Sequence, residues 1–192
     1  MSFITGTSAE VLYTSIATGT QLNTFTSEAN LMAALPVCII PAGFFYGPQG
    51  GTGKALRVKA VGRLGTTSAP TFTWTLRLLT STTWSAAGVA WSSAALTAGT
   101  TQTLAPWILD LEIVCRTLGA QGANTVLAAL GEIRSPLGLA SPFQGTIPAN
   151  NTGFTASIDN SVSQYLFLSA ACGTSNAANL IQLEMLKVYG EN

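Results

Sequence analysis

The residues that come nearest to a known chemical motif form the stretch GGTGKA at residues 50–55. In the phosphate-binding pattern GxxxxGK[ST], backbone amides hold the phosphates and the last hydroxyl binds magnesium. Pro48 stands here where the first glycine is required, and Ala55 replaces the hydroxyl residue. The residues that follow have the pattern of a strand, so no helix N-terminus is expected to face a phosphate. Nucleotide binding is therefore not expected.

Two carboxylates, Asp110 and Glu112, are two residues apart in a strand-like segment and so share one face. A glycosidase places such a pair on either side of a substrate cleft. Arg57 and Lys59 alternate in the same way in an earlier segment, and salt bridges between strands explain these charges better. Histidine is absent, which excludes Ser–His–Asp and Cys–His nucleophiles. We expect no enzymatic activity and no catalytic residues.

Three cysteines, Cys38, Cys115 and Cys172, are far apart in the sequence, and no CxxC pair occurs. Without histidine, a zinc or redox site has no support. The cysteines are expected to be buried free thiols, which suits assembly in a reducing cytoplasm. No metal and no cofactor is expected.

Tryptophans could stack on sugars, and Trp84, Trp91 and Trp107 are candidates for such a platform. Anchoring in the core or against another subunit is favoured over sugar binding, because large aromatic side chains dominate both kinds of contact.

The composition is 47% hydrophobic and only 8% charged, with a formal net charge of zero. A typical soluble domain is about 25% charged, and a surface made of hydroxyls and amides is easily buried in a contact. This favours a subunit of an assembly. There is no run of basic residues, so direct nucleic-acid binding is not expected. The most apolar stretch, residues 31–45, is short and interrupted by Pro36 and Pro41, and no signal peptide is visible, so no membrane partner is expected.

The elements that must position these residues are strands, because residues 55–79 alternate apolar and polar side chains on either side of the turn-rich GTTSAP. This pattern predicts an antiparallel hairpin. Further strands are predicted at residues 37–40, 43–46, 88–91, 104–118, 126–133, 154–158, 165–170 and 180–189. Residues 104–118 are expected to pair with 126–133, and residues 154–158 with 165–170. The fold class is all-β, an antiparallel sandwich of two sheets with a jelly-roll arrangement.

The shared alternation also predicts the core of this sandwich. Its members are Leu56, Val58, Phe72, Trp74, Leu76, Leu109, Leu111, Ile113, Leu166 and Leu183.

Residues 1–36 have few large apolar side chains and are predicted to be an extended N-terminal arm, followed by the sandwich domain at residues 37–192. A short helix is predicted from Ser27, its N-cap, to Leu35, with Pro36 ending it. The arm is expected to lie on a neighbour or on its own body, and the alternative is a disordered tail, which a monomer would favour. If it lies on a neighbour, removing residues 1–25 leaves the fold intact and weakens association. The expected subunit contacts are the apolar residues of the arm and of two long loops: Phe3, Ile4, Val11, Leu12, Tyr13, Phe25, Trp84, Trp91, Leu137 and Phe143.

The order of segments resembles the small jelly-roll or β-sandwich virion proteins of tailed bacteriophages, which decorate capsids or build tail tips. The segments that carry this resemblance are LRVKAVGRLGTTSAPTFTWTLRLL, WILDLEIVCRTLGAQG, VLAALGEI and NLIQLEMLKVYG, within about residues 54–190. The resemblance implies a structural role in the virion, assembly in the host cytoplasm, oligomerisation with a trimer favoured, and contacts with major capsid or other virion subunits. Capsid decoration is placed ahead of a tail or fibre component. A carbohydrate-binding β-sandwich that serves host recognition remains the alternative.

Overall fold

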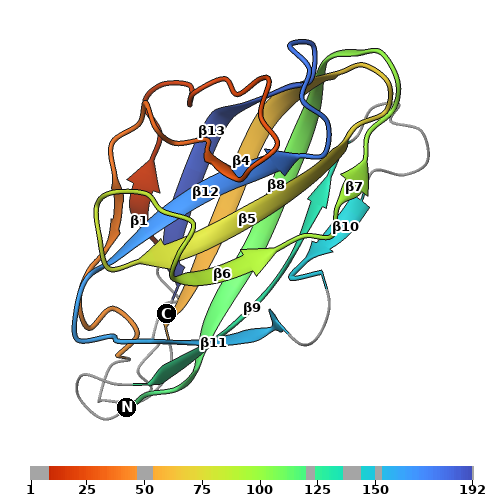
Figure 1. The fold of residues 1–192 in the computed structure, drawn as a ribbon. Coiled ribbons are helices and arrows are strands. Elements are labelled where there is room, and N and C mark those ends of the chain that lie inside the picture. Colours follow the sequence, from red (N-terminus) through yellow and green to blue (C-terminus); the bar gives the residue numbers. More distant parts are fainter. Residues whose placement is uncertain (1–8, 47–53, 120–123, 136–143, 150–152, 192) are drawn as a thin grey trace.

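Two antiparallel β-sheets packed face to face make up the part of the chain that the computed structural model describes, residues 9–46, 54–119, 124–135, 144–149 and 153–191 (Figure 1). No α-helix occurs among these residues. The all-β, two-sheet antiparallel sandwich expected from the sequence is confirmed, with a jelly-roll-like chain path that crosses repeatedly between the sheets.

The seven-stranded sheet forms the rear layer in Figure 1. Its order is β1 (Ala9–Thr14), β13 (Leu180–Glu191), β4 (Ala55–Thr66), β8 (Gln102–Thr117), β9 (Thr125–Arg134) and β10 (Gln144–Ile147), and β11 (Thr155–Ile158) also pairs with β9. The six-stranded sheet lies in front of it. Its order is β2 (Ala29–Asn30), β12 (Gln164–Cys172), β5 (Thr71–Leu79) and β6 (Val89–Ser92), while β3 (Cys38–Ile40) pairs with β12 and β7 (Leu96–Thr97) with β5.

The long strands lie where the alternation predicts them, and β8 pairs with β9 as expected. Residues 43–46 form a turn instead of the predicted strand, with Phe44 N–H donating to Pro41 O and Tyr46 N–H to Gly43 O. Strands β2, β7 and β10, of two to four residues, were not predicted.

The hairpin predicted for residues 55–79 is wrong. Strand β4 pairs with β13 and β8 in one sheet, whereas β5 pairs with β12 and β6 in the other. The loop between β4 and β5 therefore crosses the sandwich, and each strand turns its apolar face toward the opposite sheet. The predicted pair 154–158 and 165–170 fails in the same way, because β11 pairs with β9 and β12 pairs with β5.

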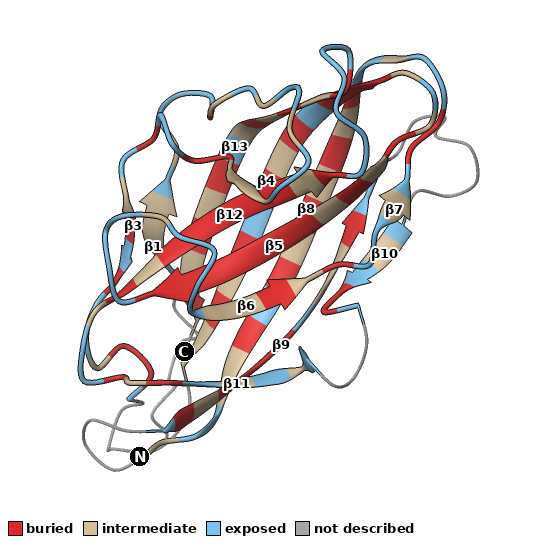
Figure 2. Cartoon of the chain, viewed as in Figure 1, coloured by how far each residue is buried: buried red, intermediate tan, exposed pale blue. Residues whose placement is uncertain are grey.

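The core lies between the two sheets, where the inward faces are buried (Figure 2). All ten residues predicted for it have no exposed surface. Trp74 of β5 and Trp107 of β8 contact each other across the two sheets, with ring centroids 5.7 Å apart. The Trp107 ring lies directly on Gly62, where an added Cβ would stand 2.3 Å from the ring and 2.1 Å from the Gln182 carbonyl oxygen. Any other residue at position 62 would force β4, β13 or Trp107 to move.

Residues 9–36 lie on the body of the same chain. Strand β1 extends the seven-stranded sheet at the β13 edge, and Leu22 exchanges two backbone hydrogen bonds with Ile181 further along that edge. Leu31 then donates its N–H to Leu168 O of β12, in the other sheet. The segment thus joins the edges of both sheets, and Leu31, Met32 and Leu35 are buried in the core.

The short helix predicted from Ser27 to Leu35 is wrong. Ala29 and Asn30 pair with β12 as β2, and a turn follows at residues 31–34. Asn30 Oδ1 accepts the Met32 N–H, a local side-chain contact of the kind that favours turns over helix.

Candidate functional site

The solvent side of the seven-stranded sheet carries most of the charge of the chain. Five of the eight basic and five of the eight acidic residues lie there: Arg57, Lys59, Arg63, Arg134, Lys187, Asp110, Glu112, Glu132, Glu184 and Glu191. Strictly alternating burial along β4 points residues 57, 59, 61 and 63 to this side. We call this surface the charged face.

The pairing register arranges the charged face in three rows that run across β13, β4, β8 and β9, in that order. The first row is Tyr189, Arg57, Glu112 and Leu130; the second is Lys187, Lys59, Asp110 and Glu132; the third is Met185, Val61, Ile108 and Arg134. Residues directly opposite each other in antiparallel strands have neighbouring side chains on one face. Val11 of β1 is opposite Tyr189 and extends the first row.

Ion pairs order the centre of the charged face. Arg57 donates two hydrogen bonds to Asp110, of 3.0 and 2.9 Å, and Lys59 Nζ lies 3.8 Å from the same carboxylate. The hydrogen bond from Arg57, together with the charges of Arg57 and Lys59, lowers the pKa of Asp110 despite its partial burial. The salt bridges expected from the sequence between these strands are therefore present, and Asp110 remains a carboxylate at neutral pH.

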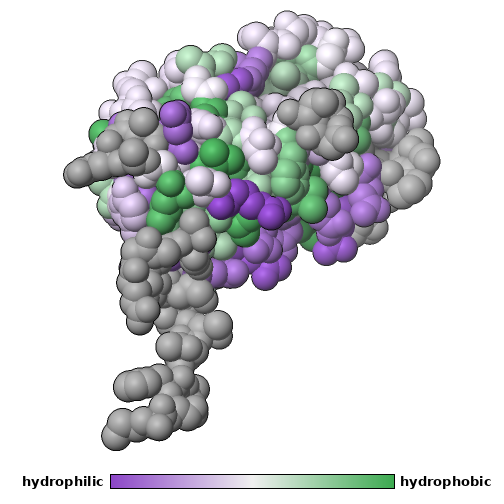
Figure 3. Space-filling model, turned by 90° about the horizontal axis from the view of Figure 1, so that it is seen from below, coloured by the Kyte–Doolittle hydropathy of each residue, from purple (hydrophilic) through white to green (hydrophobic). Residues whose placement is uncertain are grey.

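Apolar side chains stand exposed among these charges. Val11 is 58% exposed, Leu130 57% and Met185 42%. Between the second and third rows lies a hollow of about 320 Å³, lined by residues of β4, β8, β9 and β13. Seen from one end of the molecule, strongly hydrophilic and hydrophobic patches lie next to each other, and much of the hydrophilic colour is in the lower half of the view (Figure 3). A surface that alternates charge and exposed apolar area is suited to contact with another macromolecule.

A second charged cluster lies on the six-stranded sheet and is largely buried, with the Arg77 and Glu28 side chains 11% and 19% exposed. Arg77 of β5 donates two hydrogen bonds of 2.6 Å to Glu28, and Ser169 of β12 donates a third to the same carboxylate. Burial alone raises the pKa of Glu28. The hydrogen bonds from Arg77 and Ser169, together with the Arg77 charge, lower this pKa by more than burial raises it, so the net shift is downward. This cluster ties the N-terminal segment to the six-stranded sheet.

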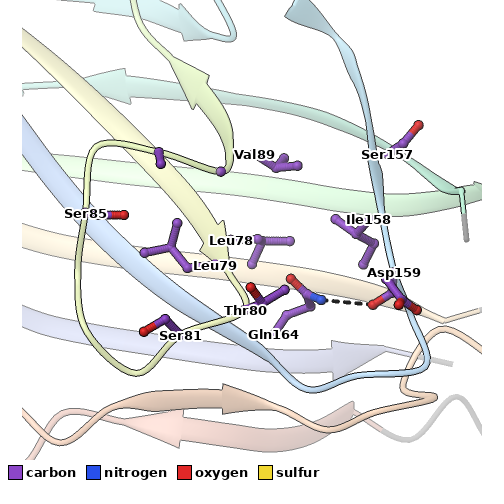
Figure 4. Close-up of a pocket in the computed structure, with 12 residues that line it drawn as sticks. Leu78, Leu79, Thr80, Ser81, Ser85, Val89, Ser157, Ile158, Asp159 and Gln164 are labelled. Atoms are coloured by element: carbon purple, nitrogen blue, oxygen red, sulfur yellow. Dashed lines mark hydrogen bonds between the residues drawn. The ribbon is translucent and has the colours of Figure 1, made fainter. Parts of the chain in front are cut away.

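A hollow of about 280 Å³ lies where the loop after β5 meets the turn between β11 and β12 (Figure 4). Leu78, Leu79, Val89 and Ile158 give it apolar walls, and Thr80, Ser81, Ser85 and Ser157 contribute hydroxyls. The Asp159 carboxylate accepts hydrogen bonds from the Ser161 N–H and hydroxyl, which lower its pKa. Gln164 Nε2 donates to Asp159 O at 2.9 Å. The described lining holds a single carboxylate and no aromatic ring, so it forms neither an acid–base pair nor a stacking platform.

The predicted subunit-contact residues are scattered. Val11 lies on the charged face, whereas Leu12, Tyr13 and Phe25 are half-buried and pack against the core. Tyr13 also donates its hydroxyl hydrogen to Pro36 O.

Trp91 has no exposed surface and belongs to the core of its own chain, so its prediction as a subunit contact is wrong. Trp84 is half-buried in the loop after β5. The remaining four predicted contacts, Phe3, Ile4, Leu137 and Phe143, lie outside the described residues.

The cysteines are free thiols, as expected. Cys38 and Cys172 are buried, and Cys115 is half-buried. Burial raises the pKa of Cys38 to about 12, so this thiol is unreactive at neutral pH. Within the described ranges, no group of three His, Cys, Asp or Glu residues is placed to hold a metal ion.

Lys54, the lysine of the GGTGKA stretch, leads into β4 and lies 5.2 Å from the centroid of the Phe44 ring. It makes a cation–π contact there. Residues 50–53 of that stretch lie outside the described residues.

The sequence did not reveal the charged face as a site. Its rows bring together β13, β4, β8 and β9, of which only β8 and β9 are consecutive in the chain. The available signal was the matching alternation of Arg57 and Lys59 with Asp110 and Glu112, which predicted the ion pairs but not their neighbours on β9 and β13.

No protein-family model matches the chain, and no curated protein matches it. Among solved structures, the chain is similar to a peanut lectin with a 9-mer peptide, at 7% sequence identity and a TM-score of 0.35; the match covers 100% of this chain and 94% of the lectin chain. No helix in the described residues is long and apolar enough to span a membrane.

Proposed function

We propose that this protein is a non-enzymatic structural subunit of an assembly and, following its resemblance to bacteriophage virion proteins, a capsid decoration protein. Its partners are then further copies of itself and the major capsid or other virion subunits, and its location is the virion. The observation that carries the structural role is the charged face. A broad sheet surface leaves Val11, Leu130 and Met185 about half exposed between ordered ion pairs.

Burying these ion pairs in a contact costs desolvation free energy, so this face suits a partner whose charges are complementary to its own. The exposed apolar side chains then contribute about 25 cal/mol for each Å² of apolar area removed from water. Elsewhere the outer surface of the chain is low in charge, in keeping with the 8% charged composition.

Quantitative mass spectrometry of purified virions from the source phage tests this function. We expect the chain at a fixed copy number per particle, retained through density-gradient purification. Capsids that lack the chain should take it up saturably when the purified protein is added. Absence of the chain from washed virions contradicts the proposal, and uptake by tails alone places the protein in the tail or fibre.

The competing candidate, a carbohydrate-binding sandwich, draws its support from the hydroxyl-lined hollow beside Asp159. Glycan-array binding by the wild-type chain that is lost on Ser81→Ala and Ser85→Ala substitution would favour it. We expect no glycan binding, since no aromatic ring lines this hollow among the described residues.

A further inference from the structure

The charges on the charged face are segregated by strand. In the first two rows, β13 and β4 supply the basic residues Lys187, Lys59 and Arg57, whereas β8 and β9 supply the acidic residues Asp110, Glu112 and Glu132. The boundary between the basic and the acidic half runs along the strands, between β4 and β8.

We propose that the partner of the charged face is a second copy of the chain, related by a two-fold axis that runs parallel to the strands between β4 and β8. This inference rests on the proposed structural role and specifies one of its contacts. A two-fold contact uses the same surface on both subunits, so that surface must be complementary to itself. The rows meet this condition.

Rotation about this axis lays each row against the same row of the second copy, with the order of the strands reversed. In the second row, Lys187 then faces Glu132 of the other copy, and Lys59 faces the other Asp110. Each contact occurs twice because of the symmetry. Basic residues meet acidic residues along the whole row.

The first row is complementary in both charge and hydropathy. Arg57 faces Glu112 of the second copy, and Tyr189 faces its exposed Leu130. In the third row, Val61 faces Ile108, and the half-exposed Met185 packs against the aliphatic part of Arg134. In none of these three rows do two like charges face each other across the contact between the copies.

The contact between Lys187 and Glu132 is available only between copies. In one chain β4 and β8 lie between β13 and β9, so the two residues are about 14 Å apart at the usual strand spacing. That distance exceeds the reach of both side chains. Lys187 makes no ion pair with any described residue, and Glu132 is bound by Arg134 at 3.3 Å with its side chain 40% exposed.

The two other acidic residues of these rows lie at the centre of the charged face, beside the basic residues of β4 in their own chain. Asp110 is bound by Arg57, and Glu112 is opposite Arg57 in the register. Substitutions at these positions would change both the subunit and the contact. Lys187 and Glu132 lie at the two ends of the second row. Glu132→Lys breaks the exposed pair with Arg134 and the hydrogen bond from Gln144 but leaves the Arg57–Asp110 pair in place, so these two positions are used for the test.

Sedimentation velocity over a range of protein concentrations provides the test. We expect the wild-type chain to form a species of twice the 19.8 kDa chain mass. Reversal of one charge, in Lys187→Glu or in Glu132→Lys, replaces two attractive contacts with two repulsive ones. Each variant should dimerise at least about tenfold more weakly than the wild type.

Mixing the two single variants gives the distinctive result. A heterodimer of Lys187→Glu with Glu132→Lys restores both pairs, one with the charges exchanged and one with the native residues. The mixture should therefore dimerise when neither variant does so alone. The double variant, Lys187→Glu with Glu132→Lys in one chain, restores both pairs in a homodimer and keeps the net charge of zero. Glu10→Lys, on the side of β1 opposite Val11, serves as the control and should leave dimerisation unchanged.

A monomer, a trimer, or dimers that survive both reversals overturn the two-fold contact. So does a mixture that fails to recover dimerisation. Circular dichroism of each variant separates weaker association from failure to fold. The presence of the chain in virions is measured independently. Failure of the two-fold contact therefore leaves the proposed structural role intact, and absence from virions does not by itself contradict the two-fold contact.

Discussion

Trp74 and Trp107 contact each other across the sandwich, and Phe72 lies 5.9 Å from Trp74 on the same strand. All three side chains have no exposed surface. At the residue scale, this aromatic cluster joins the two sheets at the point where β5 crosses β8. Deleting one ring leaves a cavity that the surrounding strands cannot close.

We therefore expect Trp74→Ala to lower the free energy of unfolding by about 3–5 kcal/mol. Denaturant unfolding followed by circular dichroism measures this loss. Trp84→Ala is the matched control, because Trp84 is only half-buried in the loop after β5 and its loss should cost much less. Equal effects of the two substitutions would show that the cluster does not join the sheets.

The buried pair of Glu28 with Arg77 predicts a pH-dependent contribution to stability. The folded state lowers the pKa of Glu28 below its ordinary value of 4.5. The contribution is therefore complete above 4.5 and is lost as the pH falls through the lower, folded-state pKa. We expect Glu28→Gln to cost about 1.5–3 kcal/mol at neutral pH, since it weakens charged hydrogen bonds from Arg77 and Ser169.

Urea unfolding of wild type and Glu28→Gln at a series of pH values tests this linkage. The difference between the two proteins should shrink as the pH falls below 4.5. Glu10→Gln, an exposed carboxylate on β1, is the control and should follow the wild type. A difference that stays constant through the acidic range would mean that Glu28 does not titrate with folding.

At the scale of elements, the N-terminal segment closes one side of the sandwich. Gly19 and Leu22 donate their N–H groups to the β13 edge, to Leu183 O and Ile181 O, and Leu31 donates to β12 in the other sheet. Phe25 packs against the core on the way. A segment that satisfies two sheet edges and covers the gap between them contributes to the fold itself.

Removal of residues 1–25 should therefore destabilise the domain, in contrast to the expectation from the sequence that the fold stays intact. The deletion removes β1, the bridge from Leu22 to Ile181, and the packing of Phe25. We expect a loss of at least about 3 kcal/mol, or roughly 6–12 °C in Tm for a chain of this size. Thermal unfolding followed by circular dichroism measures it.

Deletion of residues 1–8 is the control, because every contact described for β1, Leu22 and Phe25 then remains. It should leave the melting temperature within a degree or two of wild type. If removal of residues 1–25 lowers the melting temperature no more than this control does, the N-terminal segment does not contribute to the stability of the fold.

At the scale of the whole molecule, the described residues share one core. Leu31, Met32 and Leu35 of the N-terminal segment belong to the same cluster of buried residues as the two sheets. The three cysteines are free, so no covalent bond between side chains adds to this packing. Stability comes from the packing of the sheets and from their ladders of hydrogen bonds.

One cooperative unfolding transition is expected, with no separate event for residues 9–36. Differential scanning calorimetry should give a calorimetric enthalpy equal to the van't Hoff enthalpy. Addition of a reducing agent should leave the transition unchanged, because the cysteines form no disulfide. Two transitions would place a domain boundary near residue 36, where composition alone suggested one.

The faces of the strands could be read from the sequence. Leu56 and Val58 in β4, and Phe72 and Trp74 in β5, alternate with polar residues, and the strand period of two then assigns each side chain to the core or to solvent. The fold class follows from the same pattern, since several such strands without a helical period must pack as two sheets. These features are local properties of the chain.

The partner of each strand was decided only by the tertiary structure. Two strands that follow each other in sequence can bury their apolar faces as a hairpin in one sheet. They can do so equally well in opposite sheets, after the chain has crossed the sandwich, so alternation cannot distinguish the two arrangements. Strand β4 therefore lies beside β13 and β8, far from it in sequence, and not beside β5. The charged face depends on the same non-local pairing, because Lys187, Lys59, Asp110 and Glu132 form a row only after those strands have assembled.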